Sequence, residues 1–400
     1  MLYRVAVLVV IGAASALADP PAFAFRAEPT LAADAWTDNV LDAFHLALWA
    51  KDRAIDRLER EPSEAHPVPF AFARAAELVL LDIPIAAYAT VIPHEVFGHG
   101  ARLRELGSGA DYQFRWPPPY GFTPSSTHTR DPTVLAQPDA DLLMSQGGIA
   151  VEAYEARQLL RAAVAADAST RFETGMLVGI RIHEIVEATL PFGNNDVRHW
   201  TTVQARLSGV SAQRIQRRYL YSTIVAALLD PTFAYSGYDS FYRFLVEGHR
   251  GGALPRLPVI ARPHVTPVPW GLEYELLALA RWSTAQVELG PRLGIAPDAS
   301  VASGGLAFAA TAPIAARWVG SVALDAWLQP ALTLSGPVVL GAPPPHDRKP
   351  GAKAFVDLAW HPGAWFVGAR FIVKSDGLSE LSRYAAGVDG FVYVGVSPSL

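Results

Sequence analysis

The residues best suited to chemistry lie in one short stretch, His94-Glu95-Val96-Phe97-Gly98-His99. Two neutral imidazoles can bind a divalent metal ion, and the carboxylate beside the first can accept a proton from a metal-bound water. In the usual zinc-protease spacing, H-E-x-x-H, the two histidines are four positions apart and share one helix face. This stretch has one residue more, H-E-x-x-x-H, so the geometry of a regular helix does not bring the two histidines together.

Side chains five positions apart on a regular helix, at about 100° per residue, lie roughly 140° apart and cannot share an ion. A single π-helical turn absorbs one residue and returns His94 and His99 to the same side. Gly98 suits such a turn because it has no Cβ atom, and Pro93 is expected to mark a helix start or a kink. We therefore expect a π-bulge between the two histidines.

These six residues resemble the H-E-x-x-G-H motif of the dipeptidyl-peptidase III family of zinc exopeptidases. The resemblance implies that His94 and His99 bind zinc and that Glu95 is the general base. It also implies a third ligand, a glutamate on a later Glu-rich helix, for which this chain offers Glu152. That family's second motif begins with two adjacent glutamates, and here Val151 replaces the first. The resemblance covers only these two segments, so it supports a zinc site and not the family's fold or its release of dipeptides.

The third ligand has several candidates. Glu152 and Glu155 lie three positions apart and therefore share a helix face. The neighbours of Glu152 are apolar, which favours burial, and a buried carboxylate requires a cation or a metal. We predict Glu152 as the third ligand, while Glu155 stays open as an alternative.

A second group of polar residues, His183 and Glu187, has the i, i+4 spacing of two ligands on one helix face. Either could supply the third ligand, or an acid that orients a metal-bound histidine. His183 could also donate a hydrogen bond to the oxyanion of a tetrahedral intermediate, and we predict it as a catalytic residue. The structural alternative is an internal helix with an ion pair to Arg181.

The elements that must position these residues are helical. Apolar residues recur at helical spacing in three segments: 34–60, 140–165 and 172–190. A fourth segment is almost wholly apolar over 75–92 and is nearly long enough to cross a bilayer, but Glu77 and Asp82 would be costly there. We expect it to be a buried core helix that carries His94 and Glu95 into the interior.

Residues 105–140 are rich in Gly, Pro, Ser and Thr. So long an irregular segment inside a compact domain is usually functional or disordered. Because it lies between the helices that carry the predicted ligands, we expect it to form a rim or lid over the substrate. The Gly147-Gly148 pair that follows allows close backbone approach at the start of the next helix.

Beyond residue 270 the helical spacing gives way to alternation. Alternating runs separated by turn residues predict an antiparallel sheet, arranged as a barrel or a meander. Alternation with aromatic strand ends is similar to an outer-membrane β-barrel, but a soluble β-sandwich predicts almost the same pattern. Residues 251–270, with Gly251-Gly252 and five prolines, are predicted to be a linker.

Composition excludes several functions. The 400 residues carry a net charge of −5 and no polybasic run, so we expect no nucleic-acid partner. The absence of cysteine excludes disulfides, Cys-zinc sites and cysteine nucleophiles.

The N-terminus resembles an export signal. The basic start Met1–Arg4, the apolar run 5–11 and Ala16-Leu17-Ala18 before Asp19 fit a signal peptide, with a buried N-terminal helix as the alternative. We therefore expect export to the periplasm or outer membrane of a Gram-negative-type bacterium.

Together these patterns predict an α+β protein. Its expected parts are a signal peptide over 1–18, a mostly α-helical zinc-hydrolase-like domain over 19–250, the linker over 251–270, and an antiparallel β domain over 271–400 that could lie in the outer membrane. The predicted function is an exported zinc-dependent hydrolase of peptides or proteins, in which Glu95 activates a zinc-bound water. The alternatives are an outer-envelope β-barrel, binding or structural protein without enzymatic activity, and an enzyme that uses the metal on a non-peptide bond.

Overall fold

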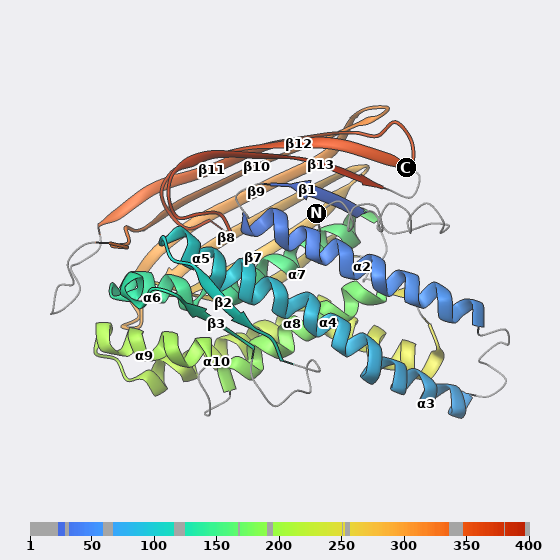
Figure 1. Cartoon of the computed structure of the whole chain (residues 1–400), viewed down its shortest axis with the longest axis horizontal. Coiled ribbons are helices and arrows are strands. Elements are labelled where there is room, and N and C mark those ends of the chain that lie inside the picture. The colour runs from blue at the N-terminus through green and yellow to red at the C-terminus, as the bar shows by residue number, and fades with distance from the viewer. Residues whose placement is uncertain are drawn as a thin grey trace.

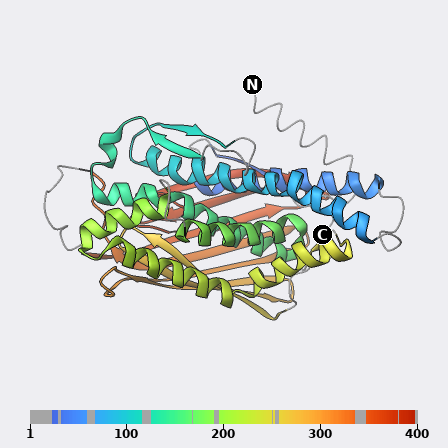
Figure 2. The ribbon, with the colours of Figure 1, turned by 90° about the horizontal axis from the view of Figure 1, so that it is seen from below.

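The computed structural model describes residues 23–28, 32–58, 67–115, 125–166, 169–189, 195–249, 251–252, 257–335, 347–379 and 381–396. Within them a large antiparallel sheet is covered on one face by helices (Figures 1 and 2), which confirms the predicted α+β class. The predicted signal peptide lies outside the described residues.

The sheet has nine strands in the order β1-β13-β12-β11-β10-β9-β8-β7-β6. The strands are β1 (Phe23–Ala27), β6 (Val259–Val268), β7 (Gly271–Trp282), β8 (Ala285–Ile295), β9 (Val301–Ala315), β10 (Trp318–Pro330), β11 (Arg348–Trp360), β12 (Trp365–Lys374) and β13 (Gly387–Val396). From β6 to β13 each strand pairs with the next along the chain, so the sheet is a meander. Its edges, β1 and β6, are not paired with each other in the described part of the chain.

Two features of the sheet differ from the predicted division of the chain. The strand β1 precedes the helices in sequence but pairs with β13, so the N-terminal segment completes the sheet. Residues 251–270, predicted to be a linker, contain the strand β6. Pro263 and Pro267 obscured its alternation, but β6 is an edge strand, and an edge strand tolerates residues that cannot donate a ladder hydrogen bond.

The helices come mainly from the N-terminal half. They are α2 (Ala33–Leu58), α3 (Pro67–Glu77), α4 (Ile83–Ile92), α5 (Gly100–Glu105), α6 (Pro138–Ser145), α7 (Gly147–Ala166), α8 (Arg171–Thr189), α9 (Asp196–Ser208), α10 (Ala212–Leu229) and α11 (Pro231–Gly237), with π-helical segments η2 (Leu78–Asp82), η3 (Pro93–His99) and η5 (Tyr238–Glu247). Trp200 and Tyr219 from α9 and α10 share a buried cluster with Val265 and Leu272 of the sheet. The two layers therefore pack directly on each other.

The smaller elements are the hairpin β2 (Ala110–Gln113) and β3 (Ser126–Thr129), the 3-10 turn η4 (Pro132–Leu135), and the short pair β4 (Ser169–Thr170) and β5 (Gly251–Gly252). The hairpin and η4 lie within the segment that we predicted as a rim or lid.

One continuous helix, Phe70–Glu105, runs from α3 to α5 and carries the histidine motif. It is long and apolar enough to cross a membrane, a test that core helices of soluble proteins also meet. Only 17% of its most apolar segment is buried. We expected a buried core helix, and the structure has one only in the C-terminal turns. Earlier in the helix Leu80 is exposed, whereas the carboxylates of Glu77 and Asp82 are paired with Lys51.

Candidate metal centre

The histidine motif lies in the π-helical segment η3, as the spacing predicted. The backbone N–H of Gly100 donates to the carbonyl of Glu95, five residues back, which is the π-helical pattern. The extra residue is thereby absorbed, and the Nε2 atoms of His94 and His99 lie 3.2 Å apart. Both histidines are buried, so the bulge directs two imidazoles to one point inside the protein.

Gly98 has a packing role in addition to the one that the spacing suggested. A Cβ atom at Gly98 would lie 2.7 Å from the carbonyl oxygen of Gly147 and 2.7 Å from Cα of Gly148. A Cβ at Gly148 would in turn lie 2.3 Å from Nε2 of His94. Three glycines therefore allow η3 and the start of α7 to approach, and this contact places Glu152 beside His94.

Replacing Gly98 with alanine is expected to destabilise the protein by about 1–3 kcal/mol, because two backbone segments must move apart. The matched control is Gly179→Ala in the interior of α8, where an added Cβ meets nothing within 4 Å. That change should be neutral or stabilising by up to about 1 kcal/mol, since alanine favours the helix. Urea denaturation followed by circular dichroism measures both. Equal stability of the two variants would contradict the close packing.

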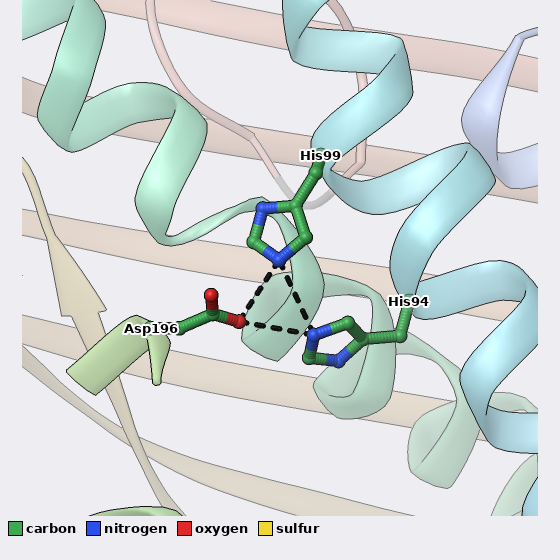
Figure 3. Close-up of side chains that lie close together, drawn as sticks. All are labelled: His94, His99 and Asp196. Carbon is green, nitrogen blue, oxygen red and sulfur yellow. Dashed lines mark hydrogen bonds and ion pairs between the residues drawn. The ribbon is translucent and has the colours of Figure 1, made fainter. Parts of the chain in front are cut away.

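A third side chain, Asp196, completes the convergence (Figure 3). One of its carboxylate oxygens, Oδ2, lies 3.0 Å from Nε2 of His94 and 2.9 Å from Nε2 of His99. In a tetrahedral zinc site with bonds of about 2.0–2.1 Å, ligand atoms are roughly 3.3 Å apart. The three atoms form a slightly smaller triangle, so a small outward movement would let His94, His99 and Asp196 hold a metal ion.

The other nitrogen of each imidazole has an acceptor of its own. Nδ1 of His94 lies 2.6 Å from Oε1 of Glu152, and Nδ1 of His99 lies 2.8 Å from the backbone carbonyl of Met144 in α6. Such contacts fix the proton on Nδ1 and leave the Nε2 lone pair for a metal, as is usual for metal-binding histidines. The two rings are thus oriented as ligands by groups from two further helices.

Asp196 was not among the residues predicted from the sequence. It is the first residue of α9, and the side chain of Asn195 caps that helix by accepting from the backbone N–H of Arg198. An aspartate in the first turn of a helix is ordinary, because it interacts favourably with the helix dipole. The sequence therefore gave no signal that separated Asp196 from a structural residue.

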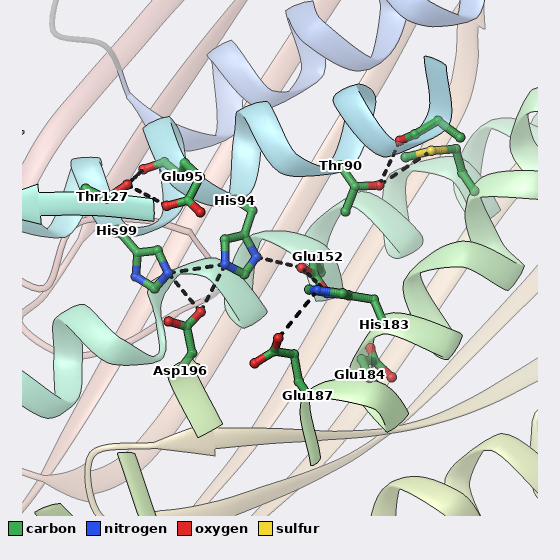
Figure 4. A network of polar contacts seen from close by, with 12 residues as sticks. Thr90, His94, Glu95, His99, Thr127, Glu152, His183, Glu184, Glu187 and Asp196 are labelled. Atoms are coloured by element: carbon green, nitrogen blue, oxygen red, sulfur yellow. Dashed lines mark hydrogen bonds and ion pairs between the residues drawn. The ribbon is translucent and has the colours of Figure 1, made fainter. Parts of the chain in front are cut away.

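Glu152 lies on the opposite side of His94 from Asp196 (Figure 4). Its side chain is 1% exposed, and its Oε2 lies 3.0 Å from Nδ1 of His183. Burial disfavours the charged carboxylate, but His183 and His94 outweigh burial and lower the pKa of Glu152 to about 2. Burial of His183 disfavours its protonated form, but the charge of Glu152 outweighs this effect and raises the pKa of that imidazole to about 9.

The predicted ligands His94, His99 and Glu152 thus do not converge on one point, because His94 faces His99 with Nε2 and Glu152 with Nδ1. The atoms of His94, Glu152 and His183 form a second group close enough to hold a metal ion. Of the other candidates, Glu187 lies 3.7 Å from Nε2 of His183. Glu155 belongs to neither group.

Glu155 is fully buried, and within the described residues neither of its carboxylate oxygens has a hydrogen-bond partner. Burial, followed by the nearby charge of Glu152, raises the pKa of Glu155 well above its usual value. Both effects favour the neutral carboxyl group, and because Glu155 also lies outside both ligand groups, we interpret it as a space-filling residue beside Glu152.

Glu95 is buried beside the histidines and is held by a residue from the segment predicted as a lid. The hydroxyl group of Thr127, in β3, lies 2.6 Å from Oε2 of Glu95 and 3.0 Å from the backbone carbonyl oxygen of Glu95 (Figure 4). Burial opposes protonation of His99, but Asp196, with a smaller contribution from Glu95, raises the pKa of that imidazole. The carboxylate of Glu95 thus lies close enough to act electrostatically on the centre.

The centre is partly exposed on the side of Asp196 and His183. The side chains of Asp196 and His183 are 24% and 37% exposed, whereas those of His94 and His99 are 10% and 5% exposed. A ligand could therefore approach from the side of α8 and α9.

Comparisons with protein families, with curated proteins and with solved structures give no match for this chain.

Proposed function

We propose that this protein is an exported zinc-dependent hydrolase that cleaves peptide bonds. The observation that carries the proposal is the convergence of His94, His99 and Asp196 through two Nε2 atoms and one carboxylate oxygen, with both Nδ1 atoms occupied. Two imidazoles and one carboxylate are a ligand set of catalytic zinc sites, which keep a fourth position open. The resemblance to the H-E-x-x-G-H motif supports zinc and a peptide substrate.

In this proposal Asp196 is the third ligand and Glu152 orients His94. Asp196 contacts both Nε2 atoms, whereas Glu152 contacts only the remaining nitrogen of one ring. A carboxylate on the far nitrogen of a metal-binding imidazole raises its basicity and fixes its direction. The sequence favoured Glu152 as the ligand, and the geometry favours Asp196.

Zinc at this position would polarise a carbonyl and lower the pKa of a bound water to about 7. Glu95 would accept the proton of the attacking water, and Thr127 would hold the carboxylate in place. His183, protonated at neutral pH and partly exposed, would donate a hydrogen bond to the oxyanion that develops on the substrate. Glu152 keeps His183 in that charged form.

The proposed activity is tested by incubating the purified mature chain with a peptide library and identifying new termini by mass spectrometry. We expect cleavage that stops with a zinc chelator and returns when zinc is added back. A zinc-loaded, folded protein that cleaves no peptide would contradict the peptidase proposal. Parallel assays with ester and phosphate substrates then test whether the same centre acts on a non-peptide bond.

A further inference from the structure

In most soluble sheets with helices on one face, the face toward the helices is apolar and the other face is polar. In this nine-stranded sheet the charged residues in the middle of the strands are on the face toward the helices and the other face is apolar. Charged residues in the middle of the strands point toward the helices, where they pair: Arg292 with Asp325, Arg370 with Asp357, and Glu288 with Arg161 of α7. The other face is apolar. Representative outward residues, each 40–59% exposed, are Leu289, Phe308, Leu324, Val356, Phe371 and Val392.

The strand register shows that this apolar face is continuous. Val322, Val356 and Phe371 are direct cross-strand neighbours on β10, β11 and β12, and the same parity extends to the other strands. Among the outward positions of β7–β13 the one charged residue is Arg348, at the first position of β11. Charges are thus excluded from the middle of the face and occur only at its rim.

Tryptophans gather at one end of the strands. Trp282 ends β7, Trp318 begins β10, Trp360 ends β11 and Trp365 begins β12. All four side chains are on the outward face, at hairpins that lie at the same end of the strands. The rings of Trp318 and Trp360 are 6.4 Å apart, and those of Trp360 and Trp365 are 5.7 Å apart. Rows of tryptophan at strand ends are typical of the boundary between hydrocarbon and water.

The edge of the sheet at β1 is satisfied without another strand. Asn39 and Asp42 of α2 accept from the backbone N–H groups of Arg26 and Ala24, and the amide of Asn39 donates to the carbonyl of Arg26. Side chains of one helix therefore replace the missing ladder. Open strand edges are excluded from hydrocarbon because their backbone groups have no partner there, and side chains of α2 supply partners for three such groups of β1.

The other edge, β6, is covered in a similar way. Trp200 donates to the carbonyl of Val268, Arg181 donates to the carbonyl of Pro263, and prolines remove two of the N–H groups. Helix α10, which packs against β6, also has exposed apolar side chains, Val225, Leu228 and Leu229, which are 52–79% exposed. Both edges are therefore compatible with an apolar environment.

We propose that the outward face of β8–β13 and of the second half of β7, from Leu276 to Trp282, lies against the hydrocarbon of a lipid bilayer, with the tryptophan row at one membrane–water boundary. At the start of β7 the outward side chains Leu272 and Tyr274 are covered by α9 and α10 and are not part of this surface. The strands contain 10–15 residues, enough for the 9–11 that a tilted strand needs to cross the apolar layer. The charge distribution is complementary to a bilayer, with an apolar middle and Arg348 at the rim opposite the tryptophans. Stacking of a second copy would also cover the apolar face, but it would not explain tryptophans gathered at one end.

The absence of cysteine makes a site-specific test direct. Single cysteines replacing Val356 and Phe371 report the centre of the face, and Asp111→Cys, in the exposed β2–β3 hairpin, is the matched water-facing control. Each is labelled with an environment-sensitive fluorophore and mixed with phosphatidylcholine–phosphatidylglycerol vesicles. We expect blue-shifted emission at the two face positions and none at the control. Bromines placed deep in the lipid chains should quench the first two labels strongly.

A charge-insertion series is the second measurement. Val356→Arg, in the middle of the face, should lower vesicle partitioning by on the order of a hundred-fold, whereas Val301→Arg, at a strand end, should have little effect. The proposal would be overturned if the labels stay water-exposed in the presence of vesicles. It would also be overturned if their emission shifts without lipid as the protein concentration rises, and that result would indicate a dimer. Neither outcome depends on metal binding, so this proposal can fail while the hydrolase proposal stands.

Discussion

Replacement of Glu95 by glutamine is expected to abolish hydrolysis while leaving the bound metal in place. Glutamine keeps the size of the side chain and can still contact Thr127, but it cannot accept a proton. Loss of a general base costs about 10²–10⁴ in rate. The measurement is the rate of peptide cleavage together with zinc content for the same preparation.

The matched control for Glu95 is Glu155→Gln. Burial and the charge of Glu152 raise the pKa of Glu155 well above its usual value, and Glu155 lies outside both ligand groups, so an amide of similar shape should preserve activity. Loss of zinc together with activity in Glu95→Gln would instead identify Glu95 as a ligand. Unchanged activity would remove it from the mechanism.

The second large effect is expected at Asp196. In the proposed centre, replacing it with alanine would remove one of three protein bonds to the metal, so zinc affinity should fall by orders of magnitude. Glu152→Ala removes a partner of His94 and not a ligand, and should weaken binding by about 10–100-fold. Competition with a chromogenic zinc chelator ranks the two variants.

The opposite ranking would return Glu152 to the role that the sequence favoured, and would move the metal to the group of His94, Glu152 and His183. Glu187→Ala provides a control for electrostatic effects, since Glu187 lies near the centre and its carboxylate is 3.7 Å from Nε2 of His183. It should keep its zinc under the same competition.

The geometry of the motif was predictable because it follows from helix arithmetic. A spacing of five positions from His94 to His99 requires a π-turn if the rings are to meet, and η3 supplies it. The glycine contact was partly predictable: Gly147-Gly148 indicated close approach, but nothing in the sequence named Gly98 as its partner. A contact between distant segments leaves no local pattern in either one.

The ligand set shows the same limit. Glu152 was found from the partial match to the second motif of the zinc exopeptidases and from its apolar neighbours, and it does contact a motif histidine. Asp196 was missed because a helix-capping environment explains it locally. Similarly, alternation predicted the strands of the sheet, but β1 is short and β6 contains prolines, so both edges escaped detection. Alternation also does not reveal which face of a sheet the helices cover.

The most direct test of the metal centre is a zinc titration of the purified protein, followed by X-ray absorption spectroscopy of the loaded protein. We predict one zinc per chain, bound by two imidazoles and oxygen ligands at about 2.0–2.2 Å, with binding lost in His99→Ala. A folded wild-type protein that binds no zinc, or that binds it equally well without His99, would contradict the proposed centre.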